Sequence, residues 1–467
     1  MAQQSEQVAI NIPEHIFRAY DIRGIAFKEL TEEIVELIGQ ALGSQAIEQG
    51  EKTIVVGRDG RLSGAQLMKS LRRGMLSSGC DVIDIGVVPT PVLYYAAQAT
   101  GTGSGVMLTG SHNPKEYNGI KMVIAGKTLA SEDIQSLLQR IKTSTFFEGN
   151  GILHEKSVTW DYINCVANDI KIIRPLKAVV DAGNGVAGSL VPQLLETLGV
   201  EVVKLYCDVD GNFPNHHPDP SRPENLSDLI EVVRKEKADV GLAFDGDGDR
   251  LGVVTSSGKI IDPDRQLMLY ALSVLRESPG AKILYDVKCT KNLAAFVKAH
   301  GGKPVMYKTG HALIKRQMKL LDAALAGEMS GHIFFNDRWF GFDDALYVAA
   351  RLLETLSNEE QSIDQLFDAI PETVNTPEIM LKVSESKKFD IVQQLRDSAL
   401  VTFTDATDII TIDGVRVEFE HGWGLVRASN TTPCLSLRFE ADSQASLALI
   451  QNRFKEWLKS IDDALIF

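Results

Sequence analysis

Cysteine is scarce in this chain, with only 5 among 467 residues. The cysteines are scattered and odd in number, and no two of them form a CxxC pair. The sequence therefore indicates neither a disulfide framework nor a thiolate zinc site. They are Cys80, Cys165, Cys207, Cys289 and Cys434.

Targeting and membrane-spanning segments are also missing. The opening stretch, MAQQSEQVAINIPEHIF, has neither the basic start nor the apolar core of a secretory signal. We find no apolar run long enough to cross a bilayer. We therefore expect a reduced, cytoplasmic protein with no membrane partner.

Positive charge is not in excess. The formal net charge is −14, which argues against a nucleic-acid or anionic-membrane partner, since both require an extended basic surface. The composition, 44% hydrophobic and 24% charged, is typical of a soluble globular protein. The length suggests about three or four domains. An anionic ligand would require positive charge to be concentrated locally.

Short β-branched runs alternate with longer amphipathic stretches, which is typical of α/β layers. Three passes, starting at Thr53, Lys177 and Lys282, share one order: strand, polar turn, helix, strand, and a last strand that ends in an unusual polar loop. Residue identities hardly match between passes, so chance recurrence remains the alternative. After residue 370 the pattern becomes strand-like segments followed by a helix-like segment, 446–461.

This pattern predicts an α/β protein with four domains. Three are related mixed α/β domains, at residues 1–155, 156–258 and 259–370. The fourth is a smaller C-terminal α+β domain at residues 371–467.

The loop DGDGDR holds the densest cluster of acids, between the apolar runs GLAF and LGVV. Asp245, Asp247 and Asp249 would repel one another in a compact turn unless a cation neutralised them, and the intervening glycines let the turn fold tightly. Carboxylate oxygens suit Mg²⁺ or Ca²⁺. An EF-hand is rejected, because its required glycine and glutamate positions hold Arg250 and Ser256. A solvated acidic turn is the plain alternative.

The stretch SGVMLTGSHNP ends an apolar strand in a serine flanked by glycine and histidine. A serine hydroxyl is a weak nucleophile, but phosphorylated Ser111 would offer both a metal ligand and a transferable phosphoryl group. Pro114 terminates the strand. On its own, this stretch would be interpreted as an ordinary turn. Because the chain also contains an acidic metal loop, a phosphorylated Ser111 that takes part in the reaction is the favoured interpretation.

Two further loops carry polar chemistry. In GEMSGH, Glu328 and Ser330 alternate and would bind neighbouring sugar hydroxyls, and His332 beside them is a candidate for proton transfer. In RASNTTP, Arg427 with hydroxyls and amides makes an anion cradle without the nucleotide P-loop pattern. A structural histidine and a capped turn are the alternatives.

Basic residues at other predicted strand ends would suit a phosphorylated substrate. They are Arg18, Arg23, Arg58, Arg61, Lys121, Lys288, Lys308 and His311.

Taken together, TGSHNP, DGDGDR, GEMSGH and RASNTTP, in that order along the chain, resemble the α-D-phosphohexomutases. FRAYDIRG, GRDGRLSG, DGNFPNHHPDP and DVKCTKN extend the resemblance, which is greatest to the bacterial bifunctional phosphomannomutase/phosphoglucomutase branch. The resemblance implies four domains around a central active-site cleft, hexose phosphates as substrates, one Mg²⁺ per chain, and glucose 1,6-bisphosphate as activator and intermediate. We expect a monomer, with a dimer left open.

The resemblance also implies the role of each site residue. Ser111 is the phosphoserine, and Asp245, Asp247 and Asp249 hold Mg²⁺ together with its phosphate. Glu328 and Ser330 bind sugar hydroxyls, and the phosphate that is not transferred binds to Arg427, Ser429, Asn430 and Thr431. The other positions around the substrate are Tyr20, Arg23, Lys121, Arg250, Lys288, His311 and His332.

The expected reaction is reversible phosphoryl transfer between C1 and C6 of mannose and glucose phosphates through phospho-Ser111. Arg250 would stabilise the transferring group, and Lys121 or His332 is the base. A hinge is expected at PETVNTPE, before the fourth domain. The alternatives are the same reaction on glucosamine phosphate, a sugar-phosphate phosphatase, and a non-catalytic sugar-phosphate sensor.

Overall fold

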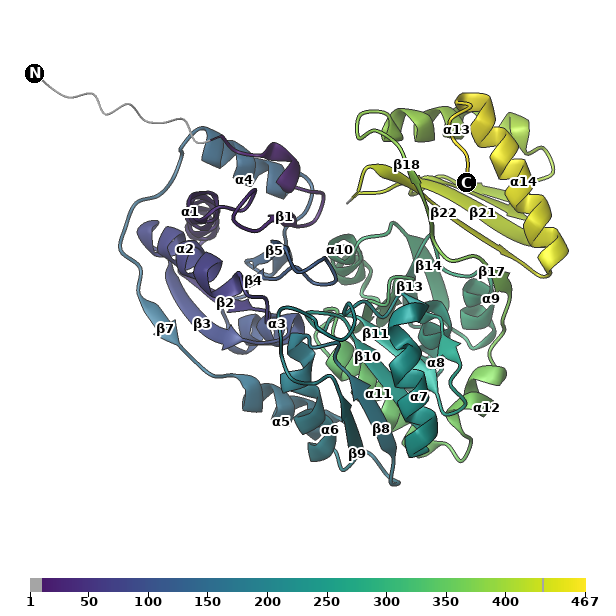
Figure 1. Ribbon diagram of the computed structural model, residues 1–467, viewed down its shortest axis with the longest axis horizontal. Coiled ribbons are helices and arrows are strands. Elements are labelled where there is room, and N and C mark those ends of the chain that lie inside the picture. Colours follow the sequence, from purple (N-terminus) through teal and green to yellow (C-terminus); the bar gives the residue numbers. More distant parts are fainter. Residues whose placement is uncertain (1–10, 431) are drawn as a thin grey trace, which may run out of the picture.

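The computed structural model describes residues 11–430 and 432–467. Four β-sheets follow one another along an arc, from the first at the left of Figure 1 to the fourth at the upper right. No helix within these residues is both long and apolar enough to cross a membrane.

The first three sheets share one topology. In each, a central strand pairs in parallel with two neighbours, and one of these neighbours pairs with a last, antiparallel strand. The shared orders are β3-β2-β4-β5, β9-β8-β10-β11 and β14-β13-β15-β16. The recurrence predicted from the sequence is therefore confirmed as recurring topology, although the residue identities differ.

The strands of the first sheet are β1 (Ile22–Ile25), β2 (Thr53–Arg58), β3 (Asp81–Val87), β4 (Gly105–Leu108), β5 (Tyr117–Ile124), β6 (Lys127–Thr128) and β7 (Leu153–Glu155). Those of the second are β8 (Lys177–Asp181), β9 (Glu201–Leu205), β10 (Val240–Phe244), β11 (Leu251–Thr255) and β12 (Ile260–Ile261). Those of the third are β13 (Lys282–Asp286), β14 (Lys303–Tyr307), β15 (Leu325–Gly327) and β16 (Ile333–Phe335).

Helices cover both faces of these sheets. Along β2, Val55 packs in a core with α3, whereas Ile54 and Val56 pack in a second core with α1 and α2, because successive side chains of a strand point to opposite faces. The core that contains Val55 continues through the second and third domains. The helices of the first three domains are α1 (Glu32–Glu48), α2 (Gly64–Ser77), α3 (Thr90–Ala99), α4 (Glu132–Lys142), α5 (Thr159–Asp169), α6 (Val191–Thr197), α7 (Ser227–Glu236), α8 (Pro263–Glu277), α9 (Asn292–Ala299), α10 (His311–Leu321), α11 (Ala345–Asn358) and α12 (Ile363–Asp368), with the short 3₁₀ helices η1 (Glu14–Ile16), η2 (Val186–Ser189) and η3 (Pro223–Leu226).

The fourth sheet is antiparallel and has its own hydrophobic core. Two helices, α13 (Lys388–Thr402) and α14 (Gln444–Ile461), contribute to that core. The sequence pattern predicts α14 but not α13, because α13 leaves Phe389, Leu400 and Val401 exposed and so lacks a clear apolar face. The strands are β17 (Val374–Asn375), β18 (Ile379–Lys382), β19 (Asp408–Ile410), β20 (Val415–Phe419), β21 (Gly422–Ala428) and β22 (Cys434–Ala441).

One buried arginine joins the fourth domain to the third. Arg416 Nη1 donates to the carbonyl oxygens of Val287 and Cys289, at 2.7 Å each. Its guanidinium lies 3.8 Å from the centre of the Trp423 ring. These contacts fix the fourth sheet against the loop that carries Lys288.

Candidate active site

The polar loops occupy equivalent places in the three related sheets. Ser111 lies between β4 and β5, Asp245 between β10 and β11, and Glu328 between β15 and β16. Arg427 lies near the end of β21, before β22. The packing of the four domains brings one loop from each of them to a common cavity.

A cavity of about 230 Å³ lies where these loops meet, and residues of all four domains line it. The predicted site residues on its wall are Tyr20, Arg23, Ser111, Lys121, Arg250, Lys288, His311, Glu328, Ser330, His332, Arg427, Ser429 and Asn430. The three aspartates of the acidic loop lie beneath the wall and are fully buried. Thr431 lies outside the described residues.

Ser111 is held in an unusual backbone conformation at the base of the cavity. Its φ of 47° lies in the left-handed region, which costs a non-glycine residue about 1–3 kcal/mol. Ser111 Oγ donates to Asp245 Oδ2 at 2.8 Å and lies 3.1 Å from His112 Nδ1. The hydroxyl of the first domain thus touches the acidic loop of the second.

The acidic loop brings its three carboxylates together in a turn. One oxygen of each of Asp245, Asp247 and Asp249 lies within 4.8 Å of the others. Gly248 has a φ of 75°, which side chains rarely adopt. Gly246 is required for a different reason, since a Cβ there would lie 2.4 Å from the Ser111 carbonyl oxygen.

Charge in this loop is only partly neutralised. Lys121 Nζ lies 2.7 Å from Asp247 Oδ2 and also contacts Asp249. Burial alone would lower the pKa of Lys121, but the two carboxylates hold it well above its usual range. Burial and the neighbouring carboxylates raise the pKa of Asp245. Among the described residues, Asp247 Oδ1 and Asp249 Oδ1 have no hydrogen-bond partner. Three buried carboxylates, one lysine and two unpartnered oxygens fit a divalent metal ion.

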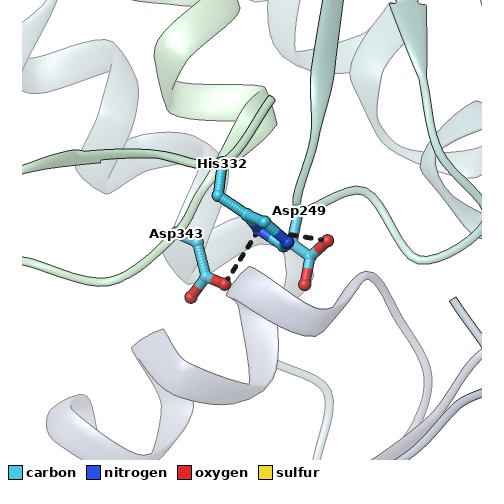
Figure 2. A group of neighbouring side chains, drawn as sticks. All are labelled: Asp249, His332 and Asp343. Carbon is cyan, nitrogen blue, oxygen red and sulfur yellow. Dashed lines mark ion pairs between the residues drawn. The ribbon is translucent and has the colours of Figure 1, made fainter. Parts of the chain in front are cut away.

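His332 lies between two carboxylates (Figure 2), its Nδ1 3.2 Å from Asp343 Oδ2 and 3.7 Å from Asp249 Oδ1. Arg250 Nε donates to His332 Nε2 at 3.0 Å. Because an arginine Nε–H can only donate, Nε2 is the acceptor nitrogen and the ring proton is on Nδ1, facing the carboxylates. The carboxylates orient the ring through its Nδ1 proton, and a ring nitrogen that carries a proton cannot ligate a metal ion. The three aspartates of the acidic loop are therefore the better metal site.

Asp343 is the residue of this cluster that the sequence did not single out. It accepts from Lys315 Nζ at 2.9 Å and lies 3.4 Å from His311 Nδ1. The only sequence signal is a pair of acids before α11, where Asp344 is the N-cap. From the sequence alone, Asp343 is therefore interpreted as part of the N-terminus of the same helix. Its meeting with His311 and His332 depends on tertiary structure.

The third and fourth domains contribute further cations to the cavity wall. Lys288 Nζ lies 3.2 Å from Glu378 Oε2, and Arg427 Nε lies 3.1 Å from Asp413 Oδ2. Burial would lower the pKa of Lys288, but Glu378 and Asp286 raise it, so the lysine is charged. Glu378 was not predicted as a site residue. Both cations come from domains other than the one carrying Ser111.

The remaining predicted residues complete the wall near the third domain. Glu328 Oε1 accepts from the backbone N–H of Gly310 at 2.6 Å, and its other oxygen has no partner among the described residues. Tyr20 lies edge-on to His311, with ring centres 5.4 Å apart. In the first domain, Arg23 pairs with Asp21 at 2.6 Å. Acceptors and cations thus surround one small space, which suits a ligand with both hydroxyls and phosphate.

Comparison with known proteins agrees with this architecture. Family models for the phosphoglucomutase/phosphomannomutase alpha/beta/alpha domains I, II and III and the C-terminal domain match residues 14–148, 160–258, 262–374 and 378–456. The chain belongs to the phosphoglucomutase/phosphomannomutase family. It is similar to a phosphomannomutase/phosphoglucomutase of Pseudomonas aeruginosa, with 54% identity over 98% of each chain. It is also similar to a phosphoglucomutase of Neisseria meningitidis, with 52% identity over 96% of this chain and 98% of that protein.

Solved structures resemble this one along its length. A phosphoglucomutase/phosphomannomutase family protein of Burkholderia thailandensis has a TM-score of 0.93 and 50% identity, covering 98% of this chain and 99% of that one. The open form of a Paramecium phosphoglucomutase, parafusin, has a TM-score of 0.75 at 17% identity, covering 96% of this chain and 95% of that one. This second likeness concerns the fold alone.

Proposed function

We propose that this enzyme moves a phosphoryl group reversibly between C1 and C6 of hexose phosphates through phosphoserine at position 111. One observation carries the proposal. The Ser111 hydroxyl of the first domain lies 2.8 Å from a carboxylate of the acidic loop, in a cavity lined by cations from other domains. Membership of a family of hexose phosphate mutases supports the same reaction.

The acidic loop supplies the metal site. Asp245, Asp247 and Asp249 would hold Mg²⁺ together with a phosphate on Ser111, and the bound ion would neutralise charge on the transferring group. Arg250 lines the cavity beside them and stabilises the same charge from the protein.

Transfer proceeds by exchange of one phosphorus–oxygen bond for another. The bond between phosphorus and Ser111 Oγ breaks as a bond forms to O1 or O6 of the sugar, the proton of that hydroxyl passes to a base, and Ser111 Oγ takes up a proton as it leaves. Of the two predicted bases, Lys121 and His332, we propose His332, because Asp247 and Asp249 hold Lys121 in its charged form. The product is a 1,6-bisphosphate. Once it has turned over in the cavity, its other phosphate returns to Ser111, so glucose 1,6-bisphosphate would also activate unphosphorylated enzyme.

Other residues of the cavity wall hold the substrate. Glu328 and Ser330 bind sugar hydroxyls, and Tyr20, Arg23, Lys288 and His311 line the path between the two ends. The phosphate that is not transferred would bind to Arg427, Ser429, Asn430 and Thr431. Since either end of the sugar must be accepted, we also propose a hinge before the fourth domain. Within the predicted segment 371–378 it would lie at residues 371–373, because β17 and Thr376 already pair with β22 in the fourth sheet.

The substrates we propose are mannose and glucose phosphates, as the names of the relatives suggest. Because one chain supplies every wall of the cavity, we expect a monomer. All five cysteines are free, which fits the reducing cytoplasm.

The test is a mutase assay in which phosphorus NMR monitors the products. Glucose 1-phosphate, mannose 1-phosphate and glucosamine 1-phosphate are each incubated with enzyme, Mg²⁺ and glucose 1,6-bisphosphate. We expect the 6-phosphates of glucose and mannose, little free phosphate, and no turnover by Ser111→Ala. Steady phosphate release would indicate a phosphatase, a preference for glucosamine 1-phosphate would indicate the amino-sugar reaction, and binding without turnover would indicate a sensor.

A further inference from the structure

Arg61 is buried beneath the Ser111 loop, in the turn that follows β2, with 2% of its surface exposed. Its guanidinium has five N–H groups, and each donates to an oxygen atom. The acceptors are Asp59 Oδ2 at 3.2 Å and the carbonyl oxygens of Pro114 at 2.6 Å, Tyr117 at 3.0 Å, Ser111 at 2.7 Å and Asn113 at 2.6 Å. Every donor of this side chain is therefore used: three of the five bonds hold the loop that carries Ser111, and a fourth holds Tyr117, the first residue of β5.

Asp59 holds the other side of the same loop. Its Oδ2 accepts from Thr109 Oγ1 at 2.8 Å and from the backbone N–H of Gly110 at 3.1 Å. Thr109 Oγ1 in turn accepts from the Ser111 N–H at 2.8 Å. The carbonyl of Ser111 is thus bound by Arg61 directly, and its N–H is bound through Thr109 by Asp59.

The loop requires this support because of its shape. Ser111 has a φ of 47°, which an unsupported serine would leave for a lower-energy conformation. Gly110 lies against the guanidinium so closely that a Cβ there would be 2.4 Å from Arg61 Cζ. The Ser111 carbonyl also contacts Gly246 of the acidic loop. Any rotation of the Ser111 peptide would move its Oγ away from Asp245.

Phe213, from the second domain, covers the guanidinium. Its ring centre lies 5.3 Å from Arg61 Cζ. Neither Arg61 nor Asp59 lines the substrate cavity. Their influence on the reaction must therefore pass through the loop.

We propose that Asp59 and Arg61 are positioning residues, which fix the backbone of Ser111 so that its Oγ faces the carboxylates of the acidic loop. The inference rests on the proposed function and deepens it. Lysine at position 61 keeps the charge but has only three donors on one atom, so it cannot reach four carbonyl oxygens and a carboxylate at once.

The experiment uses Arg61→Lys in the full-length enzyme. We expect kcat to fall about 10–100-fold while KM stays within about threefold, because the nucleophile is displaced and the substrate contacts remain. Single-turnover transfer from glucose 1,6-bisphosphate to Ser111, followed by mass spectrometry, should slow by the same factor.

Arg351→Lys is the matched control. Arg351 is also 2% exposed, binds Asp337 through two nitrogens at 3.0 and 2.8 Å, and lies 4.2 Å from the centre of the Phe335 ring. It does not line the cavity. We expect it to lower the melting temperature and to leave kcat within about twofold of wild type.

If Arg61→Lys does not fold, Thr109→Val tests the same support with an isosteric change that frees the Ser111 N–H, and the same fall in kcat is expected. A folded Arg61→Lys with wild-type kcat, or equal kcat losses in Arg61→Lys and Arg351→Lys, would overturn the inference. For Thr109→Val, wild-type kcat would overturn it too. Wild-type enzyme is measured first: if it takes no phosphate on Ser111, the proposed function itself has failed.

Discussion

Replacing Lys121 by methionine probes the charge balance of the acidic loop. The lysine is 3% exposed and neutralises Asp247 and Asp249. Removing one partner of a buried ion pair costs about 3–5 kcal/mol, because the other charge is left uncompensated. At about 2–4 °C per kcal/mol for a unit of 150–250 residues, the melting temperature of the metal-free enzyme should fall by roughly 6–20 °C.

Added Mg²⁺ should reverse much of this loss. A divalent ion in the carboxylate site supplies the charge that the variant lacks, so the rise in melting temperature between EDTA and saturating Mg²⁺ should be larger for Lys121→Met than for wild type. Differential scanning fluorimetry over a Mg²⁺ titration measures this. Lys127→Met is the control, because Lys127 pairs with Asp133 at the surface, where such a pair contributes about 0–1 kcal/mol. An equal or smaller Mg²⁺ response in Lys121→Met would refute the idea that lysine and metal share these carboxylates.

Three further predictions concern other parts of the site. Arg427→Lys should raise KM for hexose phosphates about 10–100-fold in steady-state assays, since it loses the forked contact to phosphate; an unchanged KM would exclude that contact. Gly110→Ala should lower kcat about tenfold or more, because its Cβ would collide with Arg61, and wild-type kcat would show that the loop tolerates displacement. Burial lowers the pKa of His311 from 6.5 to about 4, so the folded state resists its protonation and stability should fall by up to about 3 kcal/mol as pH drops from about 6.5 to 4. His311→Asn should flatten that part of the melting-temperature profile, and an unchanged slope would assign the loss to other groups.

Much of the architecture could be predicted because it depends on local patterns. The strand and polar-loop order of three passes along the chain becomes three sheets with one topology. The three acids of DGDGDR would repel one another in a compact turn unless a cation neutralised them, so the sequence alone predicts a metal loop, with a solvated turn as the alternative. The contact between Ser111 and Asp245 is predicted from the motif resemblance alone, because the two residues lie in loops of different sheets.

Other features have no local signal. Arg61 appears in the sequence as one more basic residue in a turn, because four of its five acceptors are backbone carbonyls, which every residue carries. Asp343 appears as part of a helix start, and only the fold brings it to His311 and His332. The glycines of DGDGDR are predicted as a source of backbone freedom, but Gly246 is required by the approach of the Ser111 carbonyl from another domain.

The most direct test of the central claim is to find where the phosphate goes. Enzyme is first dephosphorylated and then incubated with glucose 1,6-bisphosphate, with Mg²⁺ or with EDTA, before peptide mapping by mass spectrometry. The account predicts phosphate on Ser111, formed much faster with Mg²⁺, and none in Ser111→Ala. Phosphate on a different residue, or full mutase turnover by Ser111→Ala, would contradict it.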